Sequence, residues 1–171
     1  MNYNIHPIIV HFPVALLTIY SLIKILPVRK WINAFAWHDV EIALLVFGFL
    51  GALAANSTGE AAEHLVRPPH QLVEMHATFA SVTTWMYGLL LTGEILAWLK
   101  AKFYNNLKFI EYQKYINPIV KILQNKFIVL VLALVGLFAV FMTGLLGGVI
   151  VYGVTADPIA PFVLKLLNIS I

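Results

Sequence analysis

The chemistry that this chain could perform is concentrated in its histidines, because it has no cysteine and only 11% charged residues. His11 lies in an apolar opening stretch that reads His6-Pro7-Ile8-Ile9-Val10-His11-Phe12-Pro13, and His76 lies in a later apolar segment. An ionisable side chain inside an apolar segment is costly in a membrane and commonly serves a function. We therefore take His11 and His76 as the first candidates for a functional site.

Four long apolar segments must position these histidines. The chain has 171 residues, of which 61% are hydrophobic, whereas soluble domains carry about 25% charged residues. Segments at about 7–26, 39–57, 71–99 and 127–152 are each long enough to cross about 30 Å of hydrocarbon. This pattern predicts an all-α membrane protein with one transmembrane domain over residues 1–171, a four-helix antiparallel bundle.

The basic residues indicate how the bundle sits in the membrane. The first connection holds Lys24, Arg29 and Lys30, whereas the second has only Arg67. The third connection holds six lysines and one glutamate: Lys100, Lys102, Lys108, Lys114, Lys121, Lys126 and Glu111. By the positive-inside rule both termini face outward, and this topology accounts for the net charge of +3 without nucleic acid. The stretch 103–124 reads either as an amphipathic segment on the inner surface or as a linker.

His11 and His76 are predicted to lie level with each other near the outer face. At 1.5 Å per helical residue, they lie about 6 Å and about 7 Å below the start of their spans. His6, His64 and His70 also fall on the outer side. Level histidines on separate helices are what a shared site between the helices requires.

A weak internal repeat relates the two halves of the chain. The first span contains His11-x3-Ala15-x2-Thr18, and the third contains His76-x3-Ala80-x2-Thr83. The second and fourth spans carry Thr58-Gly59 and Thr143-Gly144. Two repeated helical hairpins, related by an axis along the membrane normal, would set His11 and His76 facing each other.

This arrangement favours a haem b cofactor held by His11 and His76 through its iron. Gly59 and Gly144, each after a threonine of the repeat (Thr58 and Thr143), would let a flat ring approach the backbone. Arg67 and His70 at the outer surface would receive the propionates. The alternatives are that the glycines serve helix packing and that the histidines have a hydrogen-bonded structural role.

Two other readings of the titratable residues remain open. Glu60 and His64 lie four apart on one helical face and could bind a metal ion. His76, Thr83, Tyr87 and Glu94 share one face of the third span and could relay protons. The rival function is therefore a non-redox membrane protein that handles metal or protons, or a structural subunit of a larger complex.

The chain resembles a bacterial family of small four-helix membrane proteins that is catalogued as a domain of unknown function. The resemblance is carried by the opening His-Pro-x-x-Val-His-Phe-Pro, Thr58-Gly59, His76 and Gly147-Gly148-x-x-Val151-Tyr152-Gly153. It implies a multi-pass protein of the bacterial inner membrane. Relatives joined to Rieske-type or cytochrome c modules imply a redox partner of that kind and an electron-transfer function. Whether the protein is an enzyme or a homo-oligomer does not follow.

The predicted topology can be tested with single cysteines, because the chain has none of its own. Cysteine in place of Lys108 should react with an impermeant maleimide only from the cytoplasmic side, and cysteine in place of Arg67 only from the periplasmic side. Labelling at position 67 from the cytoplasm alone would contradict the orientation and move the histidines to the other surface.

Overall fold

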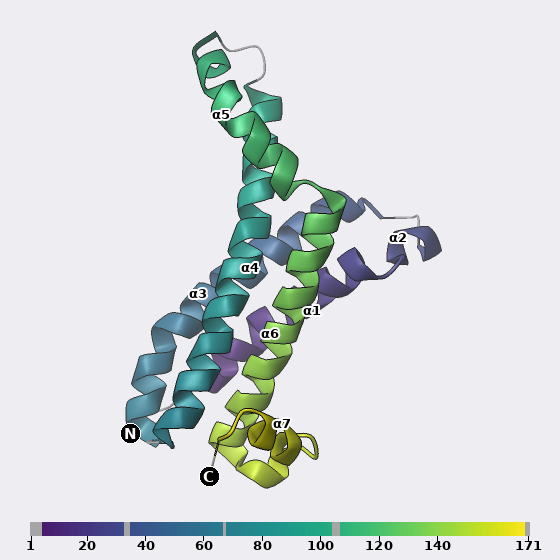
Figure 1. Ribbon diagram of the computed structural model, residues 1–171. Helices are drawn as coiled ribbons and strands as arrows, with labels where there is room; N and C mark the ends of the chain where they lie inside the picture. The colour runs from purple at the N-terminus through teal and green to yellow at the C-terminus, as the bar shows by residue number, and fades with distance from the viewer. Residues whose placement is uncertain (1–4, 33–34, 67, 104–106, 170–171) are drawn as a thin grey trace.

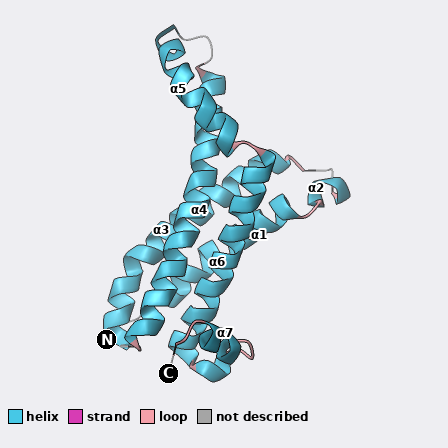
Figure 2. Cartoon of the chain, in the orientation of Figure 1, coloured by secondary structure: helices cyan, strands magenta, loops and turns pink. Residues whose placement is uncertain are grey.

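The chain is helical throughout the part that the structure describes. The computed structural model describes residues 5–32, 35–66, 68–103 and 107–169, without the side chains of 60, 64–66, 107–111 and 156. The four long helices are α1 (His6–Ile25), α3 (Trp37–Val66), α4 (His70–Lys102) and α6 (Lys126–Tyr152). The short elements are α2 (Val28–Trp31), α5 (Leu107–Leu123), the 3-10 helix η1 (Val154–Ala156) and α7 (Ala160–Leu166). These elements confirm the predicted all-α class (Figure 2).

The long helices coincide with the predicted spans. Each of the four is long and apolar enough to cross a membrane. α1 begins with His6 and Pro7, where the missing N–H of proline leaves no helical bond unmade, and it continues through Pro13. α3 and α4 run beyond the predicted limits, to Val66 and Lys102. At about 1.5 Å per residue the 33 residues of α4 reach about 50 Å, more than a bilayer core requires.

The four long helices form two hairpins. α1 packs mainly against α3, and α4 packs mainly against α6. The hairpins meet through α1 with α6 and through α3 with α4, and both of these contacts are less extensive (Figure 1). α1 and α4 therefore stand on one diagonal of the bundle, as α3 and α6 do on the other. A side chain on α1 can thus face one on α4 across the bundle interior.

The two ends of the bundle differ in chemistry. We call the end that carries His6, His70 and the segment 153–169 the histidine end, and both chain termini lie there (Figure 1). The opposite end carries the basic residues that flank the spans, and we call it the basic end. Its described members include Lys24, Arg29, Lys30, Lys100, Lys102 and Lys126.

The stretch 103–124, for which an inner-surface segment and a linker were both open, contains the helix α5, which does not cross the end of the bundle (Figure 1). α5 packs against the last turns of α4, where Leu123 contacts Gly93. Together α5 and the end of α4 extend away from the four-helix region (Figure 1). Tyr112 and Tyr115 are exposed on α5. The extra length of α4 thus serves as the surface on which α5 folds back toward α6.

Two apolar clusters hold the bundle together. At the histidine end, Leu72, Leu146 and Val163 belong to a core that joins α4 and α6 to the C-terminal helix α7. Toward the basic end, Leu17 and Leu45 belong to a core that joins both hairpins. Large apolar side chains on the outside face the positions that lipid would occupy: Phe47, Trp85, Leu134 and Phe138 are among them.

Two leucines on α6 can show whether stability depends on packing in the core or only on the apolar character of the helix. Leu146 is fully buried, whereas Leu134 on the same helix is 46% exposed. Leu146→Ala should lower the free energy of unfolding in detergent by about 2 kcal/mol or more, because it opens a cavity in the core. Leu134→Ala, the matched control, should have little effect. Equal losses for the two variants in thermal unfolding would contradict the assigned packing.

Candidate functional site

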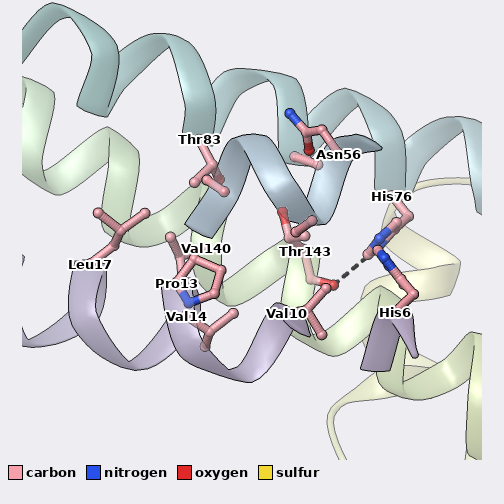
Figure 3. A pocket seen from close by; sticks show the side chains of 13 residues that line it. His6, Val10, Pro13, Val14, Leu17, Asn56, His76, Thr83, Val140 and Thr143 are labelled. Atoms are coloured by element: carbon pink, nitrogen blue, oxygen red, sulfur yellow. Dashed lines mark hydrogen bonds between the residues drawn. The ribbon is translucent and has the colours of Figure 1, made fainter. Parts of the chain in front are cut away.

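A cavity of about 60 Å³ lies between the four long helices, in the half of the bundle nearest the histidine end (Figure 3). All four helices contribute to its walls. Its apolar lining residues are Val10, Pro13, Val14, Leu17, Ala52, Ala55, Ala80 and Val140. Its polar lining residues are His6, Asn56, His76, Thr83 and Thr143. Both histidines lie at one end of the cavity, so the site has a polar end and a mostly apolar body.

His76 is held on α4 by a backbone acceptor on α6. Its Nδ1 lies 3.0 Å from the carbonyl oxygen of Thr143. Because a carbonyl can only accept, Nδ1 must carry the proton, and the lone pair of the neutral ring is on Nε2. A methyl group at Gly147 would lie 3.2 Å from His76 Cε1. The absence of a side chain at 147 therefore lets the imidazole lie against the α6 backbone.

His6 is held on α1 by a hydroxyl on α3. Its Nδ1 lies 2.9 Å from Thr58 Oγ1. The Thr58 hydroxyl donates its one proton to the helix carbonyls, including that of Ala55 at 3.0 Å. When the Thr58 proton is on these carbonyls, Oγ1 accepts from His6 Nδ1–H, and the His6 lone pair is then on Nε2 as well. A methyl group at Gly59 would lie 3.8 Å from His6 Cε1, so this ring also packs beside a glycine.

The two imidazoles form a matched pair across the bundle. They come from the diagonal helices α1 and α4 and lie at the same end of the cavity that both line (Figure 3). In the neutral state both present Nε2 as an acceptor, so neither ring can donate to the other from that atom. Such a pair can share a proton or coordinate a metal, and the oriented Nδ1–H groups are typical of metal-ligating histidines.

The predicted alignment of the two hairpins, which set His11 against His76 and Gly144 against Gly59, is wrong, because His6 and Gly147 are the residues that lie at the cavity and beside His76. From each histidine the inward positions follow at intervals of four, three and four residues. These are Val10, Pro13 and Leu17 on α1, and Ala80, Thr83 and Tyr87 on α4. His6, five residues before His11, thus corresponds to His76, and Gly147 rather than Gly144 corresponds to Gly59.

The structure does not bring His11 to the cavity. The His11 side chain is exposed on the outer surface of α1, and its Nδ1 donates to the carbonyl oxygen of Pro7 in the preceding turn. The physical reason is the 140° or so that separates residues five apart on a helix. Since α1 turns His6 inward toward Thr58, it must turn His11 away.

Of the other predicted site residues, some lie beside the two imidazoles and others do not. Thr58, Gly59, His76 and Thr143 gather around the two imidazoles. Gly144 is exposed, and a methyl group there would meet nothing within 4 Å. His70 is exposed at the first turn of α4.

Three of the residues predicted to bind propionates or a metal ion have no described side chain. Arg67 and the side chains of Glu60 and His64 fall outside the described residues. Among the side chains that are described, no three metal-ligating residues cluster.

Glycine 147 offers a direct test of how His76 is held. Gly147→Ala should displace the imidazole, because the new methyl would lie 3.2 Å from Cε1. The ¹⁵N imidazole signals of His76, assigned with a His76→Ala sample, should shift in this variant. Gly144→Ala is the matched control on the same helix and should leave them unchanged. Identical spectra for both variants would contradict the described contact.

Comparison with known proteins places the chain in a family. No curated protein and no solved structure matches it. A family model described as "Predicted membrane protein (DUF2231)" matches residues 2–157, which include all four spans and every residue that lines the cavity. The chain therefore belongs to the DUF2231 family of predicted membrane proteins.

Proposed function

We propose that the protein is a membrane-embedded electron-transfer protein in which His6 and His76 hold the iron of a haem b near the outer face. The observation that carries this proposal is the pair of imidazoles from diagonal helices at one cavity, each with Nδ1 hydrogen-bonded to the neighbouring helix of its hairpin. Two protein side chains would hold the iron, and neutral imidazole is among the usual ligands of haem iron. When bound, the haem would supply reversible one-electron chemistry.

The neighbours of each imidazole suit this role. Ligating histidines generally donate their second ring N–H to a carbonyl, carboxylate or water, which fixes the tautomer and raises the basicity of the ligand. The carbonyl oxygen of Thr143 accepts the hydrogen bond of His76 in this way, and Thr58 Oγ1 is the partner of His6. The apolar body of the cavity would exclude water from the iron and favour its less charged, reduced form.

The space for a macrocycle must come from separation of the two hairpins. A cavity of about 60 Å³ is small beside the roughly 300 Å³ or more of ordinary cofactor pockets. The two hairpins meet through their less extensive contacts, so this interface is the one that can open. His6 and Thr58 belong to one hairpin, and His76 and Thr143 to the other. Opening the interface therefore leaves each ligand oriented on its own hairpin.

The expected location of the site suits exchange of electrons with a partner outside the membrane. The positive-inside rule puts the histidine end on the periplasmic side. A cytochrome c or Rieske-type protein, the partner implied by the sequence resemblance, would approach from that side. The exposed His70 lies on the same end of the bundle.

The test is a reduced-minus-oxidised optical spectrum of protein expressed with ample haem. The wild type should give haem b bands, and His6→Ala and His76→Ala should each abolish or strongly perturb them through loss of an axial ligand. His11→Ala is the matched control, because that side chain is exposed on the same helix, and it should keep the wild-type spectrum. A colourless wild type, or a loss in His11→Ala alone, would rule the assignment out.

A further inference from the structure

The helical hairpin that α5 forms with the end of α4 carries a large positive charge. Residues 100–126 contain six lysines and a single glutamate. In the described part of the chain, the ion pairs are those that Lys24 and Arg29 make with Glu41, so no described carboxylate pairs with a lysine of this hairpin. The hairpin extends away from the four-helix region (Figure 1). Its charge is therefore open to an anionic partner.

The exposed face of α4 changes in character along this hairpin. Ile95 is 48% exposed and Trp98 is 57% exposed, and the exposed Lys102 follows one turn later. Residues three and four apart share one face of a helix. Lys102 Nζ lies 4.6 Å from the centre of the Trp98 ring. From the bundle outward, this face is thus apolar, then aromatic, then cationic.

The helix α5 repeats this order. Ile122 and Ile119 are exposed on the part of α5 nearest the bundle, and Tyr115 is exposed one turn farther out. Lys114 Nζ lies 4.8 Å from the centre of the Tyr115 ring. Since α5 folds back along α4, its sequence runs toward the bundle. The order from the bundle outward is therefore again isoleucine, aromatic ring and lysine.

The two series stand at matching levels on the hairpin. A methyl group at Gly93 would lie 3.0 Å from Leu123 Cβ, which marks where α4 and α5 touch. Nine residues outward from this contact lead to Lys102 on α4 and to Lys114 on α5, about 14 Å away along each helix. Nine residues are also two and a half turns, so each lysine points away from the contact. The two lysines therefore lie at one level on opposite sides of the hairpin.

This level corresponds to the headgroup layer of a bilayer. Trp98 lies about 42 Å along α4 from His70 at the histidine end. A bilayer is about 40–45 Å thick with its headgroups. Tryptophan and tyrosine favour the boundary between hydrocarbon and headgroups, and the long stem of lysine lets its amino group reach the phosphates.

We propose that the hairpin of α4 and α5 binds acidic phospholipids, whose phosphates lie at Lys102 and Lys114. The acyl chains then run along Ile95 on α4 and along Ile119 and Ile122 on α5. On each helix the order of isoleucine, aromatic ring and lysine matches the order of acyl chain, glycerol region and phosphate in a lipid. This binding goes beyond haem binding and does not require it.

The charge of the hairpin selects the acidic class of lipid. A zwitterionic headgroup brings a cation with its phosphate, and residues 100–126 offer that cation one carboxylate against six lysines. A lysine near the surface attracts anionic lipids with an energy equivalent to about a fivefold change in binding. A soluble acidic protein would also complement the lysines, but it would leave the isoleucines beside them in water.

The test measures quenching of Trp98 by brominated lipids in liposomes that contain the full protein. Trp31→Phe, Trp37→Phe and Trp85→Phe together leave Trp98 as the sole tryptophan. Brominated phosphatidylglycerol and brominated phosphatidylcholine, with the same acyl chains and at equal mole fraction, are compared as quenchers. Phosphatidylglycerol should bind beside Trp98 about fivefold better at low salt. Lys102→Gln in the same protein should abolish most of this preference.

Trp85 provides the matched control, because it is 71% exposed on the same helix and lies about 20 Å nearer the histidine end. A protein in which Trp85 is the sole tryptophan should be quenched equally by the two lipids. On α5, Tyr115→Trp in a protein without other tryptophans should report the same preference as Trp98 does, and Lys114→Gln should remove it.

Three outcomes would overturn the proposal. The first is equal quenching of Trp98 by the two lipids, which would leave the lysines to water or to an acidic protein. The second is a preference that survives in Lys102→Gln. The third is an equal preference at Trp85, which would show enrichment of the acidic lipid around the whole protein rather than at the hairpin.

Discussion

The structure depends above all on one constraint: inside a membrane no water is present to satisfy a polar group, so each such group needs a partner within the bundle. The threonines meet this requirement within their own helices, as Thr83 does by donating to the Phe79 carbonyl at 2.9 Å. The inward histidines instead use acceptors on the neighbouring helix of their own hairpin. Glu41, which carries a full charge, has two cationic partners. Satisfying these groups fixes how each helix is rotated about its axis.

The helices themselves were predictable from the sequence because the thickness of the bilayer sets their length. About 20 apolar residues are needed to cross it, and each of the four helices reaches or exceeds that length. The packing of α5 against α4 was not predictable in the same way. An amphipathic helix can place its apolar face on lipid or on a neighbouring helix, and composition does not distinguish these two surfaces. The length and the polar ends of each apolar run were therefore enough to predict the spans. The sequence of a connection was not enough to predict the surface on which it packs.

The site was predictable in part, and the limit lies in the rotation of α1. His76 could be identified because it is an ionisable residue within an apolar span, but the repeated pattern paired it with His11, in a register that the structure does not keep. The choice between His6 and His11 could not be made, since α1 is apolar on all sides and its sequence does not mark an inward face. The contact between His6 and Thr58 decides it, and that contact joins residues 52 apart in the chain.

Because each hairpin carries one imidazole together with that imidazole's acceptor, the site consists of two half-sites. The first hairpin contains its half before α4 and α6 are synthesised, and the complete site exists only after the second hairpin docks. Any ligand held by both imidazoles would bind the docked state alone, and it would therefore favour docking by mass action. Docking of the two hairpins in the membrane and binding of the ligand would then be one coupled equilibrium. The supply of ligand would set the fraction of chains that reach the closed form.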